Sequence, residues 1–316
     1  MILSASRRTD IPAFYAEWMC NRIKAGYCTV FNPFNRNQVK YVSLNPNDLD
    51  LIVFWTKNSI PLRPHLHLMD EREIKYYFQY TLTRYSREIE TRVPSFDILQ
   101  AEFIKLAEHV GPGRIIWRYD PIIISKRMSF QSHIDNFGSI ANKLKGLTNR
   151  VVISLVDYYE KTVKNMSEYA NNSERLDHRP ETREDFPSFV RHLVKISLEH
   201  HFEIQSCAEP IELGEYGIVH GKCIDDELVR KIFGKDVTHK KDPGQRNECG
   251  CVKSIDIGVY DTCLHGCQYC YATKNHNAAK QNYETHDPTS PSLVGWYEAQ
   301  PPTETDSNDD QLSLNF

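Results

Sequence analysis

A short apolar run that turns polar at its end stands near the middle of the chain: Ile115-Ile-Trp-Arg-Tyr-Asp-Pro121. Its β-branched and aromatic residues are typical of a buried strand. Similar runs lie on both sides of it, and amphipathic stretches separate them. The predicted strands are Ile2–Ser6, Leu51–Trp55, Tyr76–Leu82, Ile115–Tyr119, Val151–Val156, Glu203–Cys207 and Ser254–Val259. The predicted helices are Pro12–Ala25, Ser95–His109, Phe130–Lys145, Arg183–Glu199 and Asp225–Phe233.

Strands that alternate with helices predict a parallel α/β sheet. Seven or eight such units predict a complete or partial (β/α) barrel, in which functional residues gather at the carboxyl ends of the strands. Several predicted strands do end in polar clusters, such as Trp55-Thr-Lys-Asn58 and Arg118-Tyr-Asp-Pro121. These clusters make Lys57, Arg118 and Asp120 candidate catalytic residues. The alternative is that they are ordinary caps and turn formers.

Two segments depart from the alternation of strands and helices. Residues Tyr27–Leu44 predict an inserted hairpin, with Asn32-Pro-Phe-Asn35 in its turn. After about Thr285 the pattern changes to Pro, Ser, Thr, Asp and Asn, which bury too little apolar surface to offset the entropy of ordering. The sequence therefore predicts a barrel domain over residues 1–284 and a flexible, disordered acidic tail over residues 285–316.

The composition is typical of a soluble globular protein, with 40% hydrophobic and 25% charged residues among 316. There is no run of roughly 18 apolar residues, and the chain start becomes basic too soon for a signal peptide. We therefore expect a cytoplasmic protein with no membrane partner. The net charge of −4 gives no overall basic surface for nucleic acid, although it allows a local one.

The cysteines point to metal, because thiols in a large cytosolic protein stay reduced and often bind metal. The segment from Asp261 to Ala272 contains Cys263, Cys267 and Cys270 in the pattern Cys-x3-Cys-x2-Cys. Three thiolates on a short loop can hold three irons of a 4Fe-4S cubane and leave the fourth iron open. The alternative is a structural zinc site, for which His265 is the nearest fourth ligand. Its position between the first two cysteines does not match the usual pair-plus-pair spacing.

This loop resembles that of the radical SAM superfamily. The resemblance implies an enzyme whose open iron binds the amino and carboxylate groups of S-adenosylmethionine (SAM). It also implies that cluster reduction, by an electron donor such as flavodoxin or ferredoxin, cleaves SAM to a 5′-deoxyadenosyl radical. Tyr269, the aromatic residue directly before the third cysteine, would lie beside the adenine.

The position of the loop departs from that superfamily, where it normally follows the first barrel strand. Here it follows the last predicted strand, which a circular permutation of the barrel would explain. Residues Ile2–Ser6 then become the second strand, whose end makes Ser4, Ser6, Arg7 and Thr9 candidate SAM contacts. From Met1 to about Lys274 the chain also resembles the domain-of-unknown-function family 1848, whose C-terminal cysteines tie it to radical SAM proteins. That resemblance carries no settled substrate.

Six cysteines lie outside the loop. Cys207, Cys223, Cys249 and Cys251 are enough to ligate an auxiliary cluster fully, so that the chain would hold one or two 4Fe-4S clusters. The alternative is that one or more of them are free thiols. For Cys20 and Cys28 we expect ordinary buried thiols.

The chain ends in Gln311-Leu-Ser-Leu-Asn-Phe316, which looks like the peptide that binds bacterial sliding clamps. Gln311 offers an amide, and Leu312, Leu314 and Phe316 can fill adjoining pockets. The alternatives are a chance match or a small strand docked on the protein's own surface.

A clamp anchor beside a radical-generating site favours DNA repair or base modification. Trp55 and Trp117 could then help to extrude a base if they face the site. The competing hypotheses are a radical SAM enzyme acting on a small metabolite or peptide, and a non-catalytic iron–sulfur or zinc adaptor.

Overall fold

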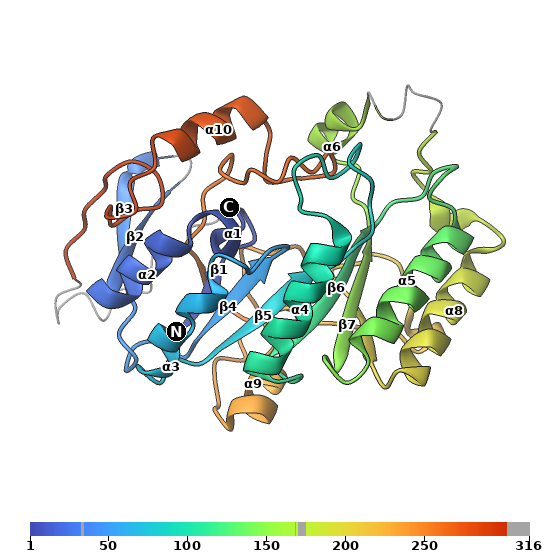
Figure 1. Cartoon of the computed structure of the whole chain (residues 1–316), viewed down its shortest axis with the longest axis horizontal. Helices are drawn as coiled ribbons and strands as arrows, with labels where there is room; N and C mark the ends of the chain where they lie inside the picture. Colours follow the sequence, from blue (N-terminus) through green and yellow to red (C-terminus); the bar gives the residue numbers. More distant parts are fainter. Residues whose placement is uncertain (33–34, 168, 170–174, 302–316) are drawn as a thin grey trace.

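The computed structural model describes residues 1–32, 35–167, 169 and 175–301. Eight parallel strands form its main sheet, in the spatial order β10-β1-β4-β5-β6-β7-β8-β9 (Figure 1). These strands are β1 Ile2–Ala5, β4 Leu51–Thr56, β5 Tyr76–Thr81, β6 Ile115–Ile122, β7 Arg150–Leu155, β8 Glu203–Ser206, β9 Val219–His220 and β10 Ile255–Asp256. A separate antiparallel hairpin joins β2 Tyr27–Asn32 to β3 Asn35–Ser43. The predicted parallel α/β class and the inserted hairpin are confirmed.

The strand order follows the sequence from β1 to β9 without a reversal. Doubly wound sheets, by contrast, reverse their strand order at a switch point. The last strand, β10, lies beside the first, with Leu3 paired to Ile255 and Ser4 to Asp256. Among the described strands no ladder joins β9 to β10, so hydrogen bonding leaves the sheet open. The sheet is therefore parallel throughout, and its last strand along the chain adjoins its first.

Nine α-helices are described: α1 Ile11–Phe14, α2 Ala16–Ala25, α3 His67–Asp70, α4 Phe96–Val110, α5 Phe130–Leu144, α6 Glu160–Asn165, α8 Phe186–Glu199, α9 Asp226–Phe233 and α10 His276–Glu284. Helices α4, α5 and α8 lie along one side of the sheet (Figure 1). The apolar residues of these three helices share one core cluster with alternate residues of the strands. None of the described helices has the length and apolar character needed to cross a bilayer.

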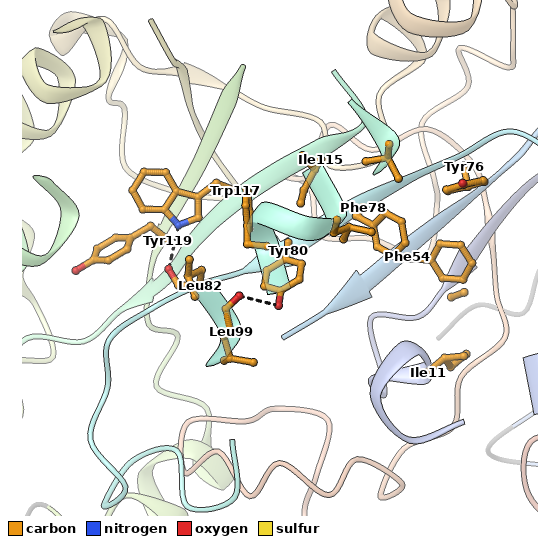
Figure 2. Packing of buried hydrophobic residues seen from close by; sticks show 14 of the residues in the cluster. Ile11, Phe54, Tyr76, Phe78, Tyr80, Leu82, Leu99, Ile115, Trp117 and Tyr119 are labelled. Atoms are coloured by element: carbon orange, nitrogen blue, oxygen red, sulfur yellow. Dashed lines mark hydrogen bonds between the residues drawn. The ribbon is translucent and has the colours of Figure 1, made fainter. Parts of the chain in front are cut away.

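Alternation along the strands separates two faces of different chemistry. Figure 2 shows the helix-covered face, where Trp117 donates to the Leu82 carbonyl over 2.9 Å and stacks 4.8 Å from Phe137. A buried tryptophan of this kind contributes about 3–5 kcal/mol to stability. The other face carries polar side chains, among them Gln79 and Arg118, whose polar atoms lie 3.3 Å apart. One face of the sheet thus packs against these helices, and the other carries a second buried apolar cluster, which includes Tyr77 and Val152, together with residues that line the candidate site.

Some predicted element boundaries differ from the structure. The helix predicted over Pro12–Ala25 breaks at Tyr15 into α1 and α2, because Asp10 caps a first short turn. The strand predicted over Ser254–Val259 has only two residues in the sheet. Helix α10 and strand β9 were not predicted, since neither has a clear apolar period.

Residues 285–301, which were predicted to belong to a flexible tail, are ordered by contacts with the rest of the fold. Residues 285–301 are described, and several of them pack against α2 and β2. Trp18 donates to the Ser290 carbonyl over 2.9 Å, and Thr29 donates to the Tyr297 carbonyl over 2.6 Å. Leu293 is buried, and the hydroxyls of Ser290 and Ser292 bind local carbonyls, which lets a polar segment pack. The predicted boundary at residue 285 is therefore wrong. The terminal peptide, with Gln311, Leu312, Leu314 and Phe316, lies outside the described residues.

Candidate functional site

A cavity of about 430 Å³ lies at the carboxyl ends of β1, β4, β5, β6, β7 and β8. The strand-end residues Lys57, Arg118 and Asp120 line it, as the predicted architecture requires. Both sets of cysteines line the same cavity: Cys263, Cys267 and Cys270 of the loop, and Cys207, Cys223, Cys249 and Cys251 of the second set. Seven thiols far apart in sequence are thus brought to one place.

The loop that carries the first three cysteines is tied to the segment after β5. Arg92 N donates to the His265 carbonyl over 2.9 Å, and Thr91 Oγ1 donates to the Gly266 carbonyl over 3.0 Å. Gly266 has a φ of +68°, and a Cβ built there would lie 2.2 Å from the Thr91 hydroxyl oxygen. Both the left-handed backbone and the close approach require glycine. The loop is therefore held in one shape by backbone contacts.

Asp10 connects this loop to the end of β4 and to the start of α1. Its carboxylate accepts hydrogen bonds from Ala13 N at 3.0 Å, Thr56 Oγ1 at 2.7 Å and Lys57 N at 2.7 Å. Nε2 of His265 lies 2.8 Å from Oδ2 of the same carboxylate, and both side chains are buried. One buried acid thus fixes the end of β4, the start of α1 and the cysteine loop.

The zinc alternative needs His265 to join the three thiols around one ion. Among the described residues, no three His, Cys, Asp or Glu side chains are grouped as ligands of a single ion. A cubane does not need such a group, because each thiolate binds a different iron. Nδ1 of His265 is buried without a hydrogen-bond partner in the described part of the chain, so one ring nitrogen is available to whatever fills the loop.

The loop's aromatic residue, Tyr269, belongs to a buried polar group. Its hydroxyl donates to Glu90 Oε1 over 2.5 Å, and Lys57 Nζ lies 2.8 Å from the same oxygen. The Lys57 ammonium also lies 5.8 Å from the centre of the Tyr269 ring. Burial raises the pKa of Glu90, but the charge of Lys57 and the hydrogen bonds from Lys57, Tyr269 and Thr83 together lower it below its ordinary value. Glu90 is therefore a carboxylate that orients both Lys57 and Tyr269.

The serines among the expected SAM contacts are bound to Asp256 of β10. Ser6 donates to Asp256 Oδ1 over 2.5 Å and lines the cavity. Ser4 donates to Asp256 Oδ2 over 2.9 Å and accepts a hydrogen bond from Trp55 Nε1, but it does not line the cavity. Of the two serines, only Ser6 is placed to touch a ligand.

Arg7 and Thr9 both line the cavity with unsatisfied groups. Nη2 of Arg7 and Oγ1 of Thr9 are buried without hydrogen-bond partners among the described residues. Such groups are costly unless a ligand or water binds them. The Arg7 guanidinium also lies 5.0 Å from the centre of the Trp55 ring. Trp117, in contrast, is in the core and does not line the cavity (Figure 2), so of the two tryptophans only Trp55 meets the condition for helping to extrude a base.

Arg118 connects the catalytic candidates to the second set of cysteines. Its Nε lies 3.0 Å from Asp120 Oδ1, and its Nη1 lies 2.8 Å from Cys223 Sγ. The guanidinium also lies 5.2 Å from the centre of the Trp55 ring. Burial alone would lower the pKa of Arg118, but Asp120 and the nearby thiols raise it well above its ordinary value. Arg118 is therefore a fixed buried cation at the cavity wall.

Sequence reasoning missed three acids that organise this site. Asp256 lies within a predicted strand, and Asp10 lies shortly after another. Their positions near strand ends could therefore have marked them as site residues. Glu90 lies between predicted elements, so its position gave no such signal.

Cys20 and Cys28 are buried away from the cavity lining, as expected, and burial raises the pKa of Cys28 to about 12.

Comparison with known protein families gives a match over most of the chain. The family model described as Domain of unknown function (DUF1848) matches residues 2–272, a range that includes both sets of cysteines. No curated protein and no solved structure matches the chain.

Proposed function

The chain belongs to the Domain of unknown function (DUF1848) family, and from that premise we propose that it is a radical SAM enzyme. One observation carries the proposal. The thiols of Cys263, Cys267 and Cys270 line, together with Tyr269, a cavity at the carboxyl ends of parallel strands. Soft donors that line a small-ligand cavity suit a cluster that also binds a cofactor.

The donor set fits a 4Fe-4S cluster with one open iron. The loop offers three thiols, and Nε2 of His265 is bound to Asp10, which leaves only its Nδ1 without a partner among the described residues. A cluster bound there would receive one electron from a flavodoxin- or ferredoxin-type donor and supply it to SAM. That electron would split SAM into methionine and a 5′-deoxyadenosyl radical, and the radical would take a hydrogen atom from the substrate.

We also propose that the fold is a circularly permuted barrel of the TIM or radical SAM type, and the strand order supports this. Strand β10, which precedes the cysteine loop, lies beside β1. Starting from β10, the spatial order is that of a barrel whose first strand carries the cluster loop. On this proposal the end of β1 belongs to the second strand and borders the cofactor.

The side chains at the end of β1 are suited to hold the amino-acid part of SAM. Nη2 of Arg7, unpaired and buried, would bind the carboxylate through a charge-assisted hydrogen bond. The Thr9 hydroxyl would bind a polar atom of the same ligand. Ser6 is held by Asp256, which fixes the backbone on which both residues lie. Lys57 and Glu90 would keep the Tyr269 ring in place beside the adenine.

DNA is the substrate proposed from the terminal peptide, with a small metabolite or peptide as the second candidate. The cavity, about 430 Å³, is within the size range of small-ligand sites. A duplex base would have to be extruded to enter it, and Trp55 is the tryptophan in the cavity lining on which such a base could stack. The same volume favours the second candidate, since a small metabolite needs no extrusion.

The proposal is tested by anaerobic reconstitution with iron and sulfide, followed by reduction in the presence of SAM. The wild-type protein should release 5′-deoxyadenosine and methionine. The variant Cys267→Ala should release neither, and Cys20→Ala, which removes a buried thiol outside the cavity, should behave as wild type. A wild-type protein that holds one zinc ion and takes up no iron would show that the proposal is wrong.

A further inference from the structure

Four thiols that the cluster loop does not use come together at the cavity. Cys207 follows β8, Cys223 follows β9, and Cys249 and Cys251 precede β10. The sulfur atoms of Cys207 and Cys223 lie 3.2 Å apart. Cys223, Cys249 and Cys251 belong to one buried cluster, against which Cys207 packs. The four thiols are therefore a continuous group built from three separate segments.

This group is not a set of disulfides. All four cysteines are free, and 3.2 Å is far longer than the S–S bond of about 2.05 Å. Cys223, Cys249 and Cys251 are buried, although free thiols contribute no more to a core than other small apolar residues. Four of them gathered at one cavity wall are better explained as ligands.

The surroundings suit a negatively charged centre. Arg118 Nη1 lies 2.8 Å from Cys223 Sγ, and Arg7 lines the same cavity as Cys251. Both guanidinium groups are buried, and Asp120 balances Arg118 from its other edge. A cluster held by four thiolates carries net negative charge, which buried arginines stabilise, and hydrogen bonds to its sulfur ligands tune its potential.

We propose that Cys207, Cys223, Cys249 and Cys251 bind a second iron–sulfur cluster, a 4Fe-4S cubane ligated entirely by protein, in the cavity that the first three cysteines also line. Iron–sulfur chemistry is favoured over zinc because structural zinc sites are closed, whereas all four of these thiols line an open cavity. Each thiolate would bind a different iron. The Cys207 and Cys223 side chains would rotate apart into the cavity to do so. This site does not depend on the reaction proposed for the cluster loop.

The experiment uses the full-length chain with the first site removed. The triple variant Cys263→Ala, Cys267→Ala, Cys270→Ala leaves the second set intact. After anaerobic reconstitution, iron and sulfide are measured chemically, zinc by elemental analysis, and the reduced cluster by electron paramagnetic resonance. Wild type should hold about eight irons per chain and the triple variant about four, with the spectrum of a reduced 4Fe-4S cluster.

A matched variant removes ligands of the second site and leaves the first site intact. Replacing Cys249 and Cys251 by serine should lower the wild-type iron content by about half and leave the SAM-dependent spectral change. If the double variant does not fold, the triple variant decides alone, because it keeps all four proposed ligands. A folded triple variant without iron, or one that holds a single zinc ion, would overturn the proposal. Failure of the radical SAM proposal would be seen in a separate measurement. The wild-type protein would then make no 5′-deoxyadenosine, and this result does not depend on how much iron the triple variant holds.

Discussion

Nε2 of His265 lies 2.8 Å from Oδ2 of Asp10, and this buried contact joins the cysteine loop to the start of helix α1. The two residues are 255 positions apart in the sequence. The same carboxylate binds Thr56 Oγ1 and Lys57 N at the end of β4. Asp10 therefore fixes the position of the cysteine loop relative to the sheet.

Asp10→Asn should weaken both the fold and the loop. An asparagine has one acceptor oxygen where the carboxylate has two, so at least one buried donor loses its partner, which costs about 1–3 kcal/mol. We expect a lower melting temperature and incomplete iron uptake after reconstitution. Asp97→Asn, at an exposed position in the first turn of α4, is the control. Full iron occupancy in Asp10→Asn would mean that the loop does not need this anchor.

Gly266→Ala should disrupt the cysteine loop through a clash. The added Cβ would lie 2.2 Å from the Thr91 hydroxyl oxygen, in a backbone region that costs a non-glycine residue about 1–2 kcal/mol. Gly146→Ala has a φ of +77° and no atom within 4 Å, so it carries the backbone strain without the clash. Iron content should fall in the first variant only. Adding Thr91→Ala to Gly266→Ala should restore part of the iron content. If it restores none, the clash with Thr91 is not the cause of the loss.

Arg7→Ala should weaken SAM binding, because the guanidinium offers an unpaired buried donor at the cavity. Loss of one charge-assisted hydrogen bond costs about 1.5–3 kcal/mol, or roughly a tenfold to hundredfold rise in Kd. Ser6→Ala should have a smaller effect in the same direction. Ser4→Ala is the matched control, since Ser4 does not line the cavity. Equilibrium dialysis with reconstituted protein measures all three. Unchanged affinity in Arg7→Ala would remove the role proposed for the end of β1.

His133 should make the fold sensitive to acid. Its two ring nitrogens contact Tyr119 Oη at 2.8 Å and the Ile123 carbonyl at 2.9 Å, and burial lowers its pKa from 6.5 to about 4. The folded chain therefore favours neutral His133, and this stability is complete above about pH 6.5 and is lost as the pH falls toward 4. At pH 5 the loss is about 2 kcal/mol.

Denaturant titrations from pH 7 to pH 5 measure this dependence. His133→Gln should lower stability at pH 7, because its hydrogen bonds are lost, but should flatten the decline toward pH 5. The exposed His192→Gln should leave the decline as in wild type. Equal pH slopes in wild type and His133→Gln would show that His133 is not the responsible group.

The terminal peptide provides the test of the proposed DNA substrate. A labelled peptide from Asp310 to Phe316 should bind a bacterial sliding clamp, because Leu314 and Phe316 can fill hydrophobic pockets of the clamp. Fluorescence anisotropy should detect this binding, and a peptide with both residues changed to alanine should not bind. Equal behaviour of the two peptides would leave a metabolite or a small peptide as the proposed substrate.

The local parts of the fold were predictable because their signals are local. Residues 115–119 show the apolar, β-branched and aromatic content of a buried strand, and β6 begins at Ile115 as predicted. The spacing of Cys263, Cys267 and Cys270 indicates a ligand loop without any knowledge of the fold. Residues 285–301 were mispredicted as flexible, because their composition is polar while their order comes from contacts with Trp18 and Thr29.

The sequence by itself determined the alternation of strands and helices and the three-thiol loop, since both depend on residues that are near one another along the chain. Only the tertiary structure decided that β10 lies beside β1, that Glu90 meets Lys57 and Tyr269, and that the second cysteines reach the same cavity. These contacts join segments tens to hundreds of residues apart. They exist because parallel strands bring their carboxyl ends to one edge of the sheet, and no short stretch of sequence encodes which ends become neighbours.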